Sequence, residues 1–173
     1  MSPRPGRWKI VGAGIGVVAI GVLAFLAYGG TPTTGSTALQ VRAWVKGSGL
    51  GQSIGTVVGD AARVRAALDA HKAVGVLRTD CGVLVADSQA ANGELPTPDH
   101  HLTNLLSSGY TLAYDAGNDC YDSGGTDQSL LRRSVRERIE AEARLQHAVT
   151  LVDQLTGAPL STTTTTQPGD TGF

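Results

Sequence analysis

The segment from Ile10 to Tyr28 constrains this chain most, because it holds nineteen consecutive residues without a charge or a strongly polar group. At about 1.5 Å per residue, a helix of this length crosses the roughly 30 Å hydrocarbon core of a bilayer. Three basic residues precede the segment, and the next charge after it is Arg42. We therefore predict a transmembrane helix over residues 10–28, a cytoplasmic stub over residues 1–9, and an extracytoplasmic location for everything after residue 28.

A cleaved signal peptide is the alternative to a retained anchor, since small residues near Ala27 could suit a peptidase. The apolar region of a cleaved signal usually has up to about 15 residues, so we expect the segment to stay as an anchor. Gly12 and Gly16 form a Gly-x-x-x-Gly pair inside it. This spacing lets some membrane helices pack closely, which makes a homodimer one interpretation and ordinary glycine usage the other.

Charge is unevenly divided between the two sides of the predicted membrane. The whole chain carries 14 basic and 15 acidic residues, and three of the basic residues lie in the stub. The external part is therefore net acidic, which argues against a nucleic-acid partner. The excess of Arg over Lys and the abundance of Ala and Gly suit a GC-rich genome, so we expect a bacterial cell envelope.

Two polar segments border one domain in the external part. Residues 29–37 are rich in Thr, Gly and Ser and predict a flexible linker. Residues 157–173 contain five consecutive Thr with flanking Pro and Gly, so we expect a disordered tail. The region between them, residues 38–156, is long enough for one small domain.

Apolar periodicity makes this domain mainly helical. Residues 39–45 alternate and predict either a short strand or a helical turn. From Ile54 to about Ala91 the period is helical, which predicts one long helix or two helices hinged near Gly75. Residues 74–85 are rich in β-branched side chains, so a hairpin is the alternative there.

Two further helices come after this region. Thr97 and Pro98 are typical of a helix start, and Gly117 ends the apolar face that comes after them. Asp127 can cap the last helix, and Gly157 supplies its stop. We therefore predict a mainly α protein: a transmembrane helix, then a three- or four-helix extracytoplasmic bundle with one disulfide, then a disordered tail.

The predicted disulfide joins Cys81 and Cys120, the only cysteines in the chain. In a simple antiparallel pair of helices, Cys81 would face residues near Ser108, and Cys120 would lie about 18 Å too far along. A disulfide tolerates about 7 Å between Cα atoms. The bridge therefore predicts either a kink at residues 107–109 or a reversal of the chain after Gly117.

Acidic and basic residues also separate along the domain. From Thr79 to Leu131 there are eight acids and no Lys or Arg, whereas arginines are frequent on both sides of this segment. Opposite charges on neighbouring helices would select one packing order. The alternative is that the acidic segment meets a cationic partner.

Two patterns could carry chemistry, and both are incomplete. Residues 51–55 match the Gly-x-Ser-x-Gly nucleophile elbow around Ser53, but the elbow needs a parallel sheet that this domain is too short to supply. Residues 115–127 form an Asp-rich segment, predicted as a loop, that resembles an ion site, but they lack the EF-hand spacing. We expect no enzyme, no cofactor and no metal, and keep a Ser53 hydrolase and an ion- or ligand-binding module as alternatives.

Tyr110, Tyr114 and Tyr121 cluster in a chain with few aromatic residues. They predict either a recognition patch or the edge of a small core. The sequence as a whole therefore predicts a single-pass membrane protein whose external helical module contacts another protein of the envelope.

Overall fold

The computed structural model describes residues 36–162, which contain helices and no strand. The helices are α2 (Thr37–Ser48), α3 (Leu50–Asp69), α4 (Val74–Asn92), α5 (His100–Ser123) and α6 (Gln128–Thr156). The predicted transmembrane helix, with Gly12 and Gly16, lies outside the described residues, as do residues 163–173. Among residues 36–162, no helix is long and apolar enough to cross a bilayer. The mainly helical fold is confirmed, but the described residues contain five helices rather than the three or four that were predicted.

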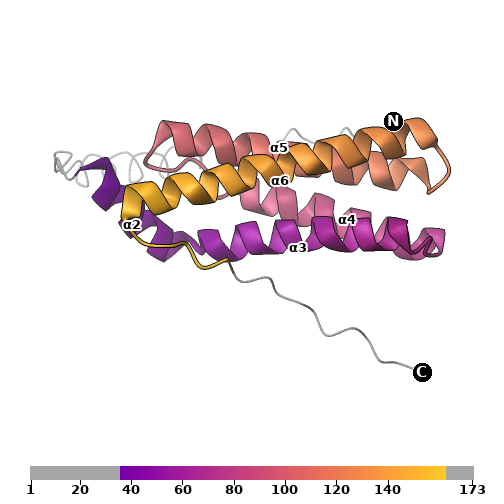
Figure 1. The fold of residues 1–173 in the computed structure, drawn as a ribbon, viewed down its shortest axis with the longest axis horizontal. Helices are drawn as coiled ribbons and strands as arrows, with labels where there is room; N and C mark the ends of the chain where they lie inside the picture. Colours follow the sequence, from indigo (N-terminus) through magenta and orange to yellow (C-terminus); the bar gives the residue numbers. More distant parts are fainter. Residues whose placement is uncertain (1–35, 163–173) are drawn as a thin grey trace, which may run out of the picture. The chain divides into compact units, whose positions relative to one another are not determined.

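Helices α3 to α6 run alternately up and down the long axis of the bundle, and α2 lies at one end of it (Figure 1). Helix α5 packs against both α4 and α6, α3 packs against α4, and α2 packs against α6. All five helices contribute to one apolar core. Its most buried large side chains include Val41, Leu50, Leu84, Leu106 and Leu145.

Residues 39–45 lie within helix α2, so the strand interpretation of this segment is wrong. Only Val41 of α2 is fully buried, so the alternating pattern does not correspond to two faces of a strand. Gly49 ends α2 with φ +66°, in the left-handed region that glycine adopts without strain. Helix α3 can therefore begin at the next residue.

The break between α3 and α4 falls earlier than Gly75. Residues 70–73 separate the helices, and His71 has φ +49°. The Lys72 N–H donates to the Ala67 carbonyl across this residue, which is the bonding pattern of a left-handed helix end. Gly75 lies in the first turn of α4, and the hairpin interpretation of residues 74–85 is wrong because the whole segment is helical.

Helix α5 is continuous, so the predicted kink at residues 107–109 and the reversal after Gly117 are both wrong. Cys81 lies eleven residues before the end of α4, whereas Cys120 lies twenty residues after the start of α5. The nine-residue difference corresponds to about 13 Å of helix. The connection over residues 93–99 supplies this offset, and Figure 1 shows α5 reaching beyond the end of α4.

The ends of α5 and α6 refine the predicted boundaries. Asp99, rather than Thr97, caps α5 by accepting a hydrogen bond from the Leu102 N–H. Asp127 caps α6 and Gly157 ends it, as predicted. After Gly157 the chain turns back, and the Leu160 N–H donates to Asp153 at 2.6 Å while its side chain packs against the core. The described start of the predicted tail, residues 157–162, thus contacts the bundle.

Candidate functional site

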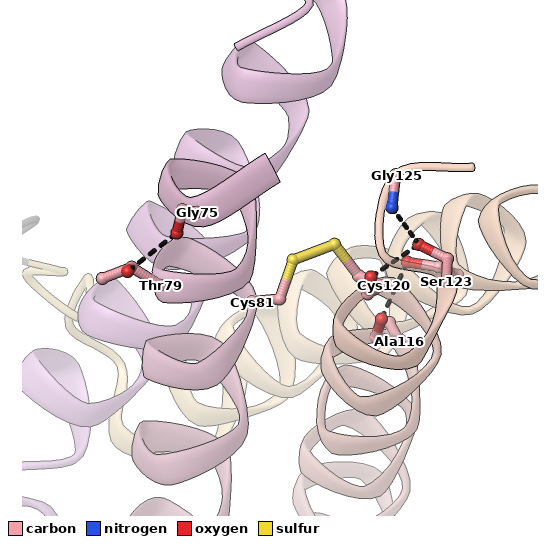
Figure 2. Close-up of a disulfide and its surroundings, with 8 residues drawn as sticks. Gly75, Thr79, Cys81, Ala116, Cys120, Ser123 and Gly125 are labelled. Carbon is pink, nitrogen blue, oxygen red and sulfur yellow. Dashed lines mark hydrogen bonds between the residues drawn. A yellow bond between two sulfur atoms is a disulfide. The ribbon is translucent and has the colours of Figure 1, made fainter. Parts of the chain in front are cut away.

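The Cys81–Cys120 disulfide is confirmed and joins the middle of α4 to the last turns of α5 (Figure 2). The two Cα atoms are 5.8 Å apart, and neither side chain is exposed. Beside the bridge, Ser123 donates from its hydroxyl to the Cys120 carbonyl at 2.6 Å and accepts from the Gly125 N–H at 3.1 Å. These bonds tie the end of α5 to the turn after it.

Helices α4 and α5 approach each other closely beside the disulfide. A Cβ atom on Gly117 would lie 2.7 Å from Cγ2 of Val85 and 3.0 Å from the Cys81 carbonyl oxygen. Gly117 therefore does not end α5, as the sequence predicted, but allows the two backbones to pack. We call α4 and α5, which the disulfide and this close contact join, the α4–α5 platform.

The three tyrosines lie on this platform in three different environments. Tyr110 is 1% exposed, Tyr114 is 36% exposed and Tyr121 is 48% exposed. Burial and the nearby Glu94 carboxylate raise the pKa of Tyr110, so its phenol stays neutral. The guanidinium of Arg78 lies over the ring of Tyr121, 5.6 Å from its centre. Tyr110 thus belongs to the core, and the other two face outward.

A pocket of about 180 Å³ opens between α4 and α5. It is lined by Ser88, Gln89 and Asn92 of α4 and by Tyr110, Thr111 and Tyr114 of α5. The hydroxyl oxygens of Ser88 and Tyr110 are buried and have no hydrogen-bond partner among the described residues. Buried hydroxyls are normally paired, and the Ser48 hydroxyl is the third in the described residues that is not. The sequence indicated the tyrosines but not the two amides.

The outward face of α5 carries two Tyr-Asp pairs, Tyr114-Asp115 and Tyr121-Asp122, seven residues apart. Both aspartates are exposed and make no ion pair within residues 36–162. Asp119, on the inner side of the same helix, behaves differently because Arg133 of α6 donates to both of its oxygens. Charge complementarity between helices therefore accounts for Asp119, whereas Asp115 and Asp122 remain exposed without an ion pair among residues 36–162.

Ser53 lies in the first turn of α3, not on a strand–turn–helix elbow. Its hydroxyl donates to Glu94 at 2.9 Å, in a shallow pocket of about 280 Å³. No histidine lines that pocket, and His100 and His101 are both exposed at the start of α5. Ser53 is therefore paired with the Glu94 carboxylate and not with a histidine. That the protein is not an enzyme stays a prediction.

The predicted Asp-rich loop is largely the end of α5, so its description as a loop is wrong. Two of its carboxylates make different contacts. Asp119 pairs with Arg133, and Asp127 caps α6 by accepting hydrogen bonds from the N–H groups of Ser129 and Leu130. Within residues 36–162, no three His, Cys, Asp or Glu side chains are grouped as a metal ion would require.

Asp60 is a buried ionisable residue that the sequence-based predictions missed. It is 1% exposed on α3, and Arg63 donates to its Oδ1. Its second oxygen has no donor among the described residues and neighbours Asp87 of α4. Burial, together with Asp87, raises the pKa of Asp60 to about 7. The signal was its position in the helical apolar stripe, three residues after Val57.

Comparison with known proteins identifies no family for this chain. No protein-family model matches it, no curated protein matches it, and no solved structure matches it. Any assignment of function therefore rests on the geometry of the α4–α5 platform.

Proposed function

We propose that this protein is a single-pass membrane protein of the bacterial cell envelope that presents the α2–α6 bundle as a binding module outside the cytoplasm. The apolar segment over residues 10–28 and its basic flank support the anchor. The buried disulfide supports an oxidising compartment, because thiols in the cytoplasm are kept reduced.

The outward stripe of α5 is the observation that carries the binding role. It presents Tyr114 and Tyr121 beside Asp115 and Asp122, which are exposed and form no ion pair within residues 36–162. Tyrosine is favoured at protein interfaces, and its ring face attracts cations. Arg78 of α4 already lies over the ring of Tyr121, so Asp115 and Asp122 are the groups of the stripe that would meet a cation of the partner. The partner that fits is a protein surface bearing Arg or Lys.

Site-specific photocrosslinking in native membranes tests this proposal. A photoreactive phenylalanine analogue at Tyr114 or at Tyr121 should trap the same partner, and added salt should reduce the yield, because exposed charge pairs are screened. The same analogue at Thr150, exposed on α6, is the matched control. Equal yields from Thr150 and Tyr121, or no adduct from either tyrosine position, would refute the proposed surface.

Protease accessibility tests the topology separately. Protease added to spheroplasts should digest the part of the chain after residue 36 and leave a cytoplasmic marker intact. If the whole chain were protected in spheroplasts and digested only after lysis, the extracytoplasmic location would be wrong. The crosslinking result would still test the binding surface independently.

A further inference from the structure

The shallow pocket beside Ser53 differs from the outward stripe of α5 in position and in charge. It has a volume of about 280 Å³ and lies between the start of α3 and the end of α4, so we call it the α3–α4 pocket. In the described part of the chain, its lining contains two carboxylates, those of Asp87 and Glu94, and no Lys, Arg or His. Asp87 is partly exposed and Glu94 is exposed, so a molecule in the pocket reaches both. The lining therefore selects a positively charged ligand.

The spacing of the two carboxylates selects a linear ligand. Asp87 lies in α4, and Glu94 follows the end of this helix by two residues. The Glu94 N–H donates to the Ala91 carbonyl at 3.2 Å, so the chain keeps a helical path to this point. The Ser53 hydroxyl, which donates to Glu94 at 2.9 Å, keeps that carboxylate at the pocket. Seven residues at helical rise correspond to about 10 Å, which is too far for one metal ion to bind both carboxylates. A cation with a positive charge at each end of a chain spans this distance.

Asp60 gives a second observation that is independent of this lining. Its side chain is 1% exposed, Arg63 donates to its Oδ1, and its Oδ2 has no donor among the described residues. Asp60 lies two turns along α3 from Ser53 and faces Asp87 across the contact with α4. The buried carboxyl group is thus directed at the end of the pocket where Asp87 lies. Arg63 comes from the same helix as Asp60, whereas the groups of α4 that act on it, Asp80 and Asp87, are both acidic.

A buried pair of carboxyl groups favours one shared proton over two negative charges. An ammonium group bound at Asp87 supplies the positive charge that α4 does not bring to this contact, and the shared proton then leaves to solvent. Burial, together with Asp87, raises the pKa of Asp60 to about 7, so this exchange falls near neutral pH. Binding of a cation at Asp87 and release of a proton are therefore coupled through Asp60.

We propose that the α3–α4 pocket binds a linear organic diammonium ion, with one ammonium group at Asp87, the other at Glu94 and an aliphatic chain between them. Ala90 and Ala91 supply the apolar surface beside that chain. Asp60 does not touch this ligand and is a positioning residue that acts through Asp87. The site depends on neither the membrane anchor nor the outward stripe of α5, so a failed protease or crosslinking experiment would leave it standing.

Isothermal titration calorimetry with the full-length chain in phosphatidylcholine nanodiscs tests the site, and empty nanodiscs correct for binding to lipid. We expect saturable binding of spermidine, whose terminal ammonium groups reach both carboxylates, and weaker binding of putrescine and of Mg²⁺, which reach one. Asp87→Asn and Glu94→Gln should each weaken spermidine binding about fivefold, because each removes one charge pair. Asp115→Asn makes the same change at an exposed aspartate outside the pocket and should leave the affinity unchanged.

The pH profile of binding tests the role of Asp60. In the native chain, spermidine binding should strengthen from about pH 6 to about pH 8 and should release a proton, which a dependence of the measured enthalpy on the buffer reveals. Asp60→Asn keeps the shape of the side chain and removes the shared proton, so this variant should bind spermidine with little dependence on pH. If Asp60 only supported the fold, its replacement would leave the pH profile unchanged, and the positioning role would be wrong.

Three results would overturn the proposed site. The first is no saturable binding of spermidine, and the second is equal affinity for spermidine in Asp87→Asn and the native chain. The third is equal affinity for spermidine, putrescine and Mg²⁺, which would show a general attraction of cations to an acidic surface. If Asp87→Asn fails to fold, Glu94→Gln at the exposed end of the pocket tests the same lining, and unchanged affinity there also refutes the site.

Discussion

Two buried aspartates, Asp119 on α5 and Asp60 on α3, have opposite surroundings. Asp119 faces the neighbouring helix α6, from which Arg133 donates to both of its oxygens. Asp60 faces the neighbouring helix α4, from which it meets another carboxyl group, that of Asp87. The cation that pairs with Asp60, Arg63, comes from its own helix. The α5–α6 contact thus compensates a buried charge between helices, and the α3–α4 contact does not.

This difference shows that the interactions of α4 with α5 differ in kind from its interactions with α3. On the α5 side it has the disulfide and the close packing at Gly117. On the α3 side it brings a carboxyl group against another carboxyl group, an arrangement that favours a shared proton over two negative charges. We infer that the attachment of α4 to α5 is stable, whereas its attachment to α3 depends on pH.

We expect the largest effect on stability from removing the disulfide that joins α4 to α5. The double variant Cys81→Ser with Cys120→Ser should lower the free energy of unfolding by about 4 kcal/mol, because the bridge closes a loop of about 40 residues and restricts the unfolded chain. Urea denaturation followed by circular dichroism measures this. The native chain in reductant is the control and should lose a similar amount, and an unchanged midpoint in both would show that packing alone holds α4.

We expect the second-largest effect at the α3–α4 contact, where Asp60 lies beside Asp87. Because burial raises the pKa of Asp60 from 3.8 to about 7, the folded protein binds a proton that the unfolded chain releases between these values. Stability should therefore fall as pH rises from about 4 to about 7. Asp60→Asn mimics the protonated form, so it should stabilise the protein at pH 8 by roughly 2 kcal/mol and change little at pH 5.

Asp87→Asn provides the matched control for that measurement. It removes the second carboxyl group of the pair, which raises the pKa of Asp60 less than burial does, so it should reduce the pH dependence between pH 4 and pH 7 without abolishing it. If Asp60→Asn were destabilising at pH 8 as well as at pH 5, the carboxylate of Asp60 would be the favourable form and the comparison would be wrong.

The same substitution at Asp119 should have the opposite sign. Asp119→Asn removes the charge that the Arg133 guanidinium contacts in bidentate geometry, so it should destabilise the protein by about 1 kcal/mol at pH 8. Since the arginine is half exposed, salt should reduce the loss. Denaturation at low and at high ionic strength measures both quantities, and a gain in stability would remove the distinction between the two aspartates.

The helices could be predicted from the sequence wherever local signals agreed. Asp127 and Gly157 mark the ends of α6, and the structure places the helix between them. The segment 39–45 was ambiguous because its alternation matches a strand, and only packing against α6 selects the helix. The path of residues 93–99 was not predictable, since no local rule fixes how far a connection carries the next helix along the bundle.

The candidate site was predictable only in part. The tyrosines stood out because aromatic residues are few, and the cysteines because there are two of them. Asp60 fell within an apolar stripe, which could have marked it as buried, but its neighbour Asp87 is distant in sequence. The pocket depends on the offset between α4 and α5, so the grouping of Asn92 with Tyr110 required the structure.

The smallest effect compares two buried serines on the two sides of the molecule. Ser134 of α6 donates to the Ala116 carbonyl of α5 at 2.7 Å, whereas the hydroxyl of Ser88 on α4 has no partner among the described residues. Ser134→Ala should therefore destabilise the protein by about 0.5–1 kcal/mol. Ser88→Ala should stabilise it by about 0.5 kcal/mol, because it removes an unpaired hydroxyl and alanine favours the helix.

The sign of the stability change at Ser88 shows whether its hydroxyl is paired in the free protein. If Ser88→Ala lowers the melting temperature as much as Ser134→Ala does, a bound water pairs the Ser88 hydroxyl in the free protein. The buried hydroxyls of the α4–α5 contact are then as completely hydrogen-bonded as those of the α5–α6 contact. If it raises the melting temperature, the hydroxyl is unpaired in the free protein. Alanine then fills the same position without an unpaired polar group, and the buried hydroxyls of the α4–α5 contact are less completely paired than those of the α5–α6 contact.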